Sequence, residues 1–240
     1  MSIGNPAQDR PADYRKFELK ELGVDTDAFL QHVRPFYDSF PWDMHDVVRY
    51  AVAEPTRRRV IAEFALGLRE HAWDVLRVPA VPYVQPDCGG VDRSARVFPE
   101  APIELTEHSE LLKFQTAVAD IVLAVRSDVT KLRMVLTFLR TVHEEGRAGI
   151  CTFEGQPHMD GADYIVSALV TNRINLKAWS GESSVHTLNR EMLMSTVLQP
   201  GEGIFQDDRN LMHHITDIKR DKPGEAGIRD IVGIDIQLIS

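Results

Sequence analysis

Cysteine is almost absent from this sequence, which has only Cys88 and Cys151 among its 240 residues. Two thiols are too few for a disulfide framework or for a metal site made of four sulfur ligands. Such scarcity is typical of proteins from a reducing compartment. We therefore expect a cytoplasmic location.

Long apolar runs are also absent. The longest purely aliphatic stretch, residues 121–125, is far shorter than the roughly 20 residues that a membrane-spanning helix needs. The first residues, Met-Ser-Ile-Gly-Asn-Pro, contain no apolar core of a signal peptide. We expect no membrane partner.

Positive charge is in deficit, because 27 Lys and Arg residues stand against 36 Asp and Glu residues, a formal net charge of -9. Non-specific binding to nucleic acids or to anionic membranes relies on the opposite sign. The expected partner is therefore a small molecule and not a nucleic acid. A hydrophobic fraction of 43% is sufficient for a sizeable core.

The first half of the chain carries mainly helical patterns. Apolar residues recur at helical spacing in residues 25–40, 55–76 and 109–125, which predicts three helices. The first 22 residues are polar and predict a loose arm or an edge segment. Residues 77–104 contain five prolines, so we expect an irregular connection with at most short edge strands.

The second half of the chain has the texture of short strands separated by turn residues. The expected strands are residues 132–142, 149–153, 162–171, 174–179, 184–189, 196–198, 204–205, 210–216 and 229–239. Helices followed by such a series of strands predict an α+β fold, in which antiparallel sheets form a jelly roll and the N-terminal helices pack on one sheet. No internal repeat divides the chain, and we expect a single domain.

Histidine and an acidic residue two positions apart occur three times in the sequence. Residues two apart on an extended segment point the same way, so such a pair can reach one metal ion. Two imidazoles and one carboxylate on one face of a non-haem ferrous ion leave three positions open for other ligands. With 9 histidines and 36 acidic residues the pattern also arises by chance, and context has to choose among the three.

The sequence context favours His158 and Asp160. His108 and Glu110 lie at the predicted start of a helix, where an acidic residue suits the helix dipole. His143 and Glu145 lead into a solvated turn and remain a competitor. His158 and Asp160 follow Gly155 and Pro157 and lead directly into an apolar strand, which places them at the mouth of a sheet. Without this context, a surface turn pair is the simpler interpretation.

The third ligand is expected in the strand-like run Leu211-Met212-His213-His214-Ile215-Thr216. Adjacent strand residues face opposite ways, so only one of His213 and His214 can join His158 and Asp160. Alternation does not decide between them.

The last expected strand has one apolar and one polar face. Val232, Ile234, Ile236 and Leu238 make the apolar face, and Arg229 lies on the other. A polar face inside a small barrel predicts a cavity that holds a ligand. A guanidinium matches the geometry of a carboxylate, so Arg229 is the expected anchor for an acidic co-substrate. A structural ion pair with Asp230 or Asp235 is the alternative.

Six segments, in this order, resemble the bacterial Fe(II) and 2-oxoglutarate dependent dioxygenase family that includes the L-isoleucine and related free L-amino-acid hydroxylases. They are Glu154-Gly-Gln-Pro-His158-Met-Asp160-Gly161-Ala-Asp163, Arg173-Ile-Asn175, Gly181-Glu182-Ser183, Asp207-Asp208-Arg209, Met212-His213-His214-Ile-Thr216 and Arg229-Asp230. The resemblance covers about residues 130–240.

The resemblance implies a double-stranded β-helix, the cupin-like form of the jelly roll. It also implies that His158, Asp160 and His213 bind Fe(II) and that Arg229 binds the 5-carboxylate of 2-oxoglutarate. The implied reaction uses O2, releases succinate and carbon dioxide, and hydroxylates a small substrate. Residues 1–128 would be a mainly helical support and residues 129–240 the jelly-roll catalytic core of one dioxygenase domain.

A free or modified L-amino acid is the expected substrate. Its ammonium and carboxylate groups need one acidic and one basic side chain near the metal. Asp163, Arg173 and Glu182 follow family positions and are the candidates, although each is equally consistent with a surface charge. We also consider a second copy of the chain as a partner, in a homodimer.

Two departures from the family pattern leave the substrate open. His214 stands where a glycine is usual, and Lys177-Ala-Trp179-Ser180 replaces a shorter turn before Gly181. Two alternatives to the hydroxylase remain. One is a cupin-like metalloprotein whose chemistry does not use 2-oxoglutarate, and the other is a stress-related protein that binds a ligand without turnover.

Overall fold

A computed structural model describes residues 14–82, 96–153 and 155–239. Its strands are β1 (Tyr14–Glu18), β2 (Arg57–Arg69), β3 (Ala72–Val78), β4 (Lys131–Glu144), β5 (Arg147–Ala148), β6 (Tyr164–Ile174), β7 (Ser183–Thr187), β8 (Met192–Thr196), β9 (Glu202–Asp207), β10 (Leu211–Ile215) and β11 (Gly227–Leu238). Its α-helices are α1 (Thr26–Val33), α2 (Met44–Tyr50), α3 (Ile103–Thr106) and α4 (Ser109–Val125), and η1 (Leu19–Leu22) and η2 (Arg34–Ser39) are 3-10 turns.

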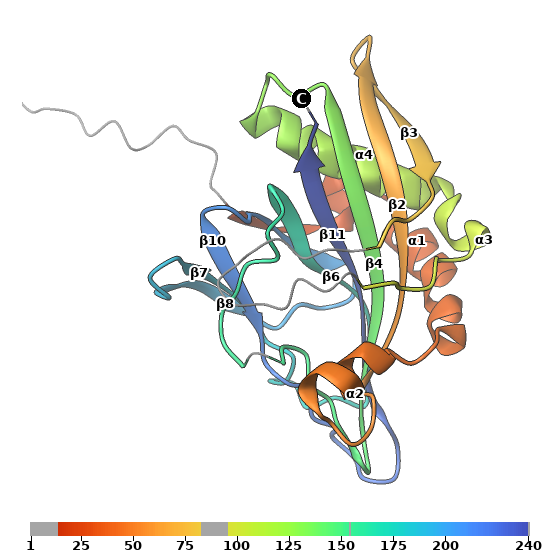
Figure 1. The fold of residues 1–240 in the computed structure, drawn as a ribbon, viewed down its shortest axis with the longest axis vertical. Helices are drawn as coiled ribbons and strands as arrows, with labels where there is room; N and C mark the ends of the chain where they lie inside the picture. Colours follow the sequence, from red (N-terminus) through yellow and green to blue (C-terminus); the bar gives the residue numbers. More distant parts are fainter. Residues whose placement is uncertain (1–13, 83–95, 154, 240) are drawn as a thin grey trace, which may run out of the picture.

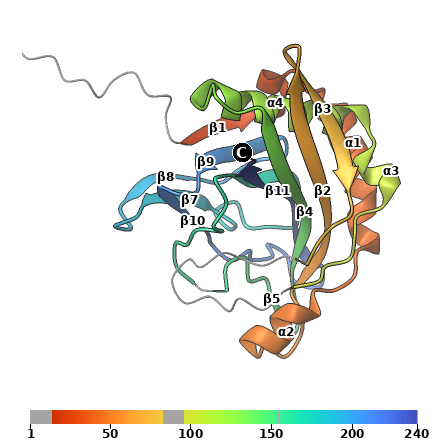
Figure 2. The same cartoon turned by 45° about the horizontal axis from the view of Figure 1, so that its top comes forward.

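The strands form two antiparallel sheets. The larger sheet has the order β1-β9-β6-β11-β4-β2-β3, with β5 paired to β4, and the smaller sheet has the order β10-β7-β8. Helices α1 and α4 cover one face of the larger sheet, and the smaller sheet lies on the opposite side (Figures 1 and 2). This α+β arrangement is the predicted jelly roll with helices packed on one sheet.

The main hydrophobic core lies between the larger sheet and the helices. Phe29 of α1 and Phe114 of α4 meet edge to face, with ring centroids 5.8 Å apart, and both are fully buried. Phe138 of β4 and Val232 of β11 face the same cluster. A second, smaller cluster lies between the two sheets and includes Val170 of β6 and Val185 of β7. The polar cavity described below also opens on this inner side.

The predicted helix over residues 55–76 was wrong, because this segment forms the hairpin β2–β3. Strand β2 runs between β3 and β4, and both of its faces are covered over residues 60–64. A strand that is buried on both faces loses its alternation of polar and apolar residues. In this strand Val60, Phe64 and Leu68 happen to lie four positions apart, and this spacing resembles the apolar face of a helix.

The other predicted elements are confirmed in part. Helix α4 coincides with the predicted helix 109–125, and residues 25–40 form α1 followed by η2, where Pro35 ends the regular helix. The edge segment at the N-terminus is β1, which pairs with β9. The part of the first 22 residues before Tyr14, and residues 83–95 in the predicted connection, lie outside the described residues.

Three predicted strands were misplaced. Residues 149–153 form a loop, because Gly149 takes a positive φ of 68° and packs against His143 and Ile218. Residues 174–179 leave the sheet after Ile174, where Asn175 has a φ of 48°. Strand β8 ends at Thr196 and does not include residues 197–198. The remaining six predicted strands correspond to β4, β6, β7, β9, β10 and β11.

Among the described residues, no helix is both long enough and apolar enough to cross a membrane.

Candidate metal centre

His158, Asp160 and His213 converge at one point on the inner side of the larger sheet. His158 and Asp160 lie in the loop before β6, and His213 lies on β10. His158 and His213 form an isolated antiparallel bridge, in which the His158 amide donates to the His213 carbonyl at 3.0 Å and the His213 amide donates to the His158 carbonyl at 2.8 Å. The backbone itself therefore brings the two imidazoles together.

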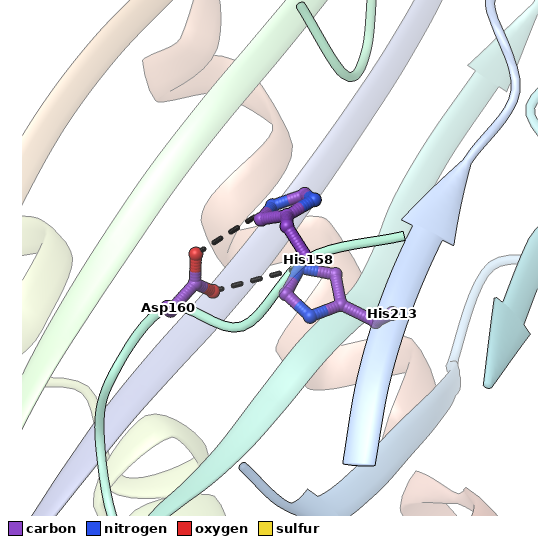
Figure 3. Close-up of side chains that lie close together, drawn as sticks. All are labelled: His158, Asp160 and His213. Atoms are coloured by element: carbon purple, nitrogen blue, oxygen red, sulfur yellow. Dashed lines mark ion pairs between the residues drawn. The ribbon is translucent and has the colours of Figure 1, made fainter. Parts of the chain in front are cut away.

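The side chains of these three residues face one another (Figure 3). The Asp160 carboxylate lies 3.7 Å from Nε2 of His158 and 3.6 Å from Nε2 of His213. One ligand atom from each residue lies within 4.8 Å of the others. No other group of three such residues was found in the part of the chain that the structure describes. Two imidazoles and one carboxylate at this spacing fit a ferrous ion and leave coordination positions open.

Asp208 holds the loop that carries Asp160. Its buried carboxylate accepts hydrogen bonds from the amides of Asp160 at 3.3 Å, Gly161 at 2.6 Å and Ala162 at 3.1 Å. Burial, together with the negative charge of Asp160, raises the pKa of Asp208. From the sequence, Asp208 was named only within the segment Asp207-Asp208-Arg209 and was assigned no supporting role.

His214 lies next to His213 on β10 and faces away from the group. Its backbone register pairs it with Ser184, and the group of ligand atoms does not include it. Burial and the nearby His158 lower the pKa of its imidazole.

The histidines of the two other His-acid pairs, which competed with His158 and Asp160 as metal ligands, make hydrogen bonds elsewhere in the fold. His108 is the N-cap of α4, where its Nδ1 accepts from the Glu110 amide at 3.3 Å, and its ring stacks on His32 with centroids 3.9 Å apart. His143 lies at the end of β4, and its Nδ1 accepts from the Arg220 amide at 3.4 Å.

A cavity of about 160 Å³ opens beside the three converging side chains. The inner face of the larger sheet forms one wall. Its lining residues there are Arg57, Arg59 and Ile61 of β2, Thr137 and Leu139 of β4, Val166 and Ser167 of β6, and Ile231, Gly233 and Asp235 of β11. The odd-numbered face of β11 thus borders the cavity, as the pattern of the last strand predicted.

Aromatic residues and arginines also line the cavity. Tyr50 stacks on Phe153 with ring centroids 4.3 Å apart, and both line the cavity. Arg59 pairs with Asp43 at 2.8 Å and lies over the ring of Phe98, 4.6 Å from its centroid. Sequence reasoning missed Arg57 and Arg59, because the segment that carries them was predicted to be a helix.

Arg229 precedes the β11 residues that line the cavity, is 2% exposed and is not itself among the lining residues. Its Nη2 is 3.4 Å from Oγ of Ser183, and its Nε is buried without a hydrogen-bond partner. Among the described residues no carboxylate forms an ion pair with Arg229, and Asp230 is instead bound by Arg140 through two hydrogen bonds of 2.7 and 2.9 Å. A buried guanidinium that has no ion-pair partner in the protein suits a site for the carboxylate of a ligand.

The three expected substrate residues do not line the cavity. Asp163 is buried, accepts from the Leu238 amide at 2.6 Å and pairs with Arg209. Glu182 is half-buried, and its amide donates to Oγ1 of Thr216 at 2.9 Å. Arg173 lies near Arg229, and its Nη2 donates to the Ser180 carbonyl at 2.9 Å.

Solved structures of low sequence identity share this fold. A bsmA homolog from Methylobium petroleophilum PM1 has a TM-score of 0.78 at 19% identity, with 94% of this chain and 88% of that chain covered. IDO from Bacillus thuringiensis has a TM-score of 0.73 at 11% identity, with 95% and 91% covered. The Fe(II)/(alpha)ketoglutarate-dependent dioxygenase TqaL has a TM-score of 0.70 at 16% identity, with 95% and 83% covered.

No curated protein matches the sequence significantly. The model of a protein family described as 2OG-Fe dioxygenase, in contrast, matches residues 36–235, which include the three converging side chains and Arg229. The chain therefore belongs to the 2OG-Fe dioxygenase family, whose reaction uses Fe(II), 2-oxoglutarate and O2.

Proposed function

We propose that this protein hydroxylates a small substrate, a free or modified L-amino acid, with His158, Asp160 and His213 holding Fe(II) and Arg229 holding the 5-carboxylate of 2-oxoglutarate. The observation that carries the proposal is the convergence of three ligand atoms within 4.8 Å at the edge of a polar cavity. Bound Fe(II) supplies the activation of O2 that no amino-acid side chain provides.

The chain's own residues position the reactants. The two imidazoles come from separate segments that the backbone bridge holds in register, so the ligand set is preorganised. Arg229 offers a buried charge to the far end of the co-substrate, where hydrogen bonds to a carboxylate are strong because water is excluded. Phe98, Phe153 and Tyr50 line the cavity with aromatic surface.

The character of the cavity supports a small, charged substrate. Arginines Arg57 and Arg59 and the carboxylate of Asp235 line it together with apolar and aromatic residues. A zwitterionic amino acid presents both signs of charge and an aliphatic chain, and this mixture of side chains suits it.

A panel of the twenty L-amino acids and their N-acyl forms tests the proposal. The protein is reconstituted with Fe(II) without oxygen, and air and 2-oxoglutarate are then added. We expect one class of substrate to increase succinate formation and to gain the mass of one oxygen atom. Asp160→Ala is the matched control and should remove both signals. An amino acid panel that yields no oxidised product, while succinate still forms slowly without substrate, would exclude an amino acid as the substrate.

A further inference from the structure

Arg173 and Arg229 are direct neighbours in the larger sheet. Arg229 of β11 is in register with Arg173 of β6 on one side and with Thr141 of β4 on the other. Side chains at paired positions of antiparallel strands lie on the same face of the sheet. The two guanidinium groups therefore extend to the same side, toward the turn formed by residues 180–183.

The opposite face of the same strands is electrically balanced. Asp230 pairs in register with Asn172 and Arg140, and it binds both of their side chains. Arg140 also pairs with Asp38. The fold therefore supplies acidic partners for the buried arginine on that face.

No such balance is found for Arg173 and Arg229. Within the described ranges of the chain, neither forms an ion pair with a carboxylate, and Nε of Arg229 and Nη1 of Arg173 are buried without a hydrogen-bond partner. Burial lowers the pKa of both groups, and the positive charge of Arg173 lowers that of Arg229 further. Arg229 is buried and Arg173 is half-buried. Two neighbouring like charges in this environment without a counter-ion are costly, and a bound anion would offset that cost.

The turn beside the pair leaves room for the two arginines. Gly181 has a positive φ of 68°, and a Cβ there would lie 3.0 Å from Cδ of Arg229. The Ser180 carbonyl fixes Arg173, and the Ser183 hydroxyl lies near Nη2 of Arg229. One short segment thus orients both guanidinium groups.

We propose that Arg173 is a second positioning residue for the co-substrate, and that it shares the distal carboxylate of 2-oxoglutarate with Arg229. This inference rests on the proposed role of Arg229. It differs from the expectation that Arg173 binds the amino-acid substrate. A pair of guanidinium groups gives the subsite a preference for ligands with a carboxylate at the end away from the metal.

Binding of two matched ligands to protein loaded with Mn(II) tests the proposal. 2-Oxoglutarate and 2-oxopentanoate share the chelating end and the five-carbon chain, but only 2-oxoglutarate has a distal carboxylate. Isothermal titration gives Kd for both ligands with the wild type, Arg173→Gln, Arg173→Lys and Arg229→Gln. Arg69→Gln is the control, because Arg69 lies on the exposed end of β2.

We expect Arg173→Gln to raise the Kd for 2-oxoglutarate by about tenfold and to leave the Kd for 2-oxopentanoate unchanged. Arg173→Lys should restore part of the lost affinity for 2-oxoglutarate. The thermal midpoint without ligand should not fall, since one of two repelling charges is removed. Equal affinity of Arg173→Gln and wild type for 2-oxoglutarate would overturn the proposal, as would an equal loss for both ligands. A wild type that binds the two ligands equally would instead contradict the role of Arg229 in the proposed function.

Discussion

Gly181 controls how closely the chain can approach Arg229. Its φ of 68° lies in the left-handed region, and a Cβ would meet both Arg229 Cδ at 3.0 Å and Ile218 Cγ2 at 3.1 Å. Gly146 also has a positive φ, of 81°, but a Cβ there would meet nothing within 4 Å. The two glycines therefore separate the cost of the backbone conformation from the cost of crowding Arg229.

Gly181→Ala should lower the affinity for 2-oxoglutarate and reduce the free energy of unfolding by about 2–4 kcal/mol, because steric overlap adds to backbone strain. Gly146→Ala should reduce the free energy of unfolding by only about 1–2 kcal/mol and leave the affinity for 2-oxoglutarate unchanged. Urea unfolding and ligand titration of both variants provide the measurements. Similar values for the two variants would argue against a role of Gly181 in placing Arg229.

At the scale of elements, the hairpin β2–β3 contributes strand β2 to the wall of the cavity, and the sequence pattern did not predict it. Strand β2 carries Arg57 and Arg59 to the cavity, but both of its faces are covered and its sequence lacks alternation. The strands with clear patterns, such as β11, were predicted with their faces assigned. Periodicity reports burial on one side of an element, and it fails where both sides are buried.

The candidate metal centre was predictable for a different reason. A spacing of two and the adjacent strand identified His158 and Asp160, but alternation left His213 and His214 equivalent. Register with β7 and the bridge to His158 decide between them, and both are long-range contacts that a local pattern does not contain. The side chains that line the cavity could not be predicted for the same reason, because the cavity is assembled from five strands and several loops.

The turn of the β2–β3 hairpin offers a test at this scale. Arg69 pairs with Ala72, so Glu70 and His71 form a two-residue loop, and their φ values are 46° and 74°. Positive φ at both positions favours Asn-Gly over Glu-His. Replacing Glu70 and His71 by Asn and Gly should raise the free energy of unfolding by about 1 kcal/mol. A lower thermal midpoint for this double variant would contradict the described hairpin.

At the scale of the whole molecule, we propose that the chain is one domain. The main core combines Phe17 of β1, Phe29 of α1 and Phe114 of α4 with residues of β4, β6 and β11. Strand β2 also pairs with β4 along most of its length. Residues 129–240 therefore depend on the first half of the chain for an edge of the sheet and for the cover of one face.

Unfolding should accordingly occur in one cooperative transition. Trp73 is buried at the helical side and Trp179 is exposed near the start of β7, so single-tryptophan variants report on the two regions separately. We expect both probes and the far-ultraviolet circular dichroism signal to give the same denaturant midpoint. A fragment of residues 129–240 should remain unfolded. Two separate midpoints would indicate two independent units.

Anaerobic titration with Fe(II) tests the central claim most directly. The wild type should bind one ion per chain, and His158→Ala, Asp160→Ala and His213→Ala should each lose stoichiometric binding, because only two ligands remain. His214→Ala is the matched control on the adjacent position and should bind one ion as the wild type does. Full iron binding by Asp160→Ala, or loss of iron in His214→Ala with retention in His213→Ala, would contradict the assigned centre.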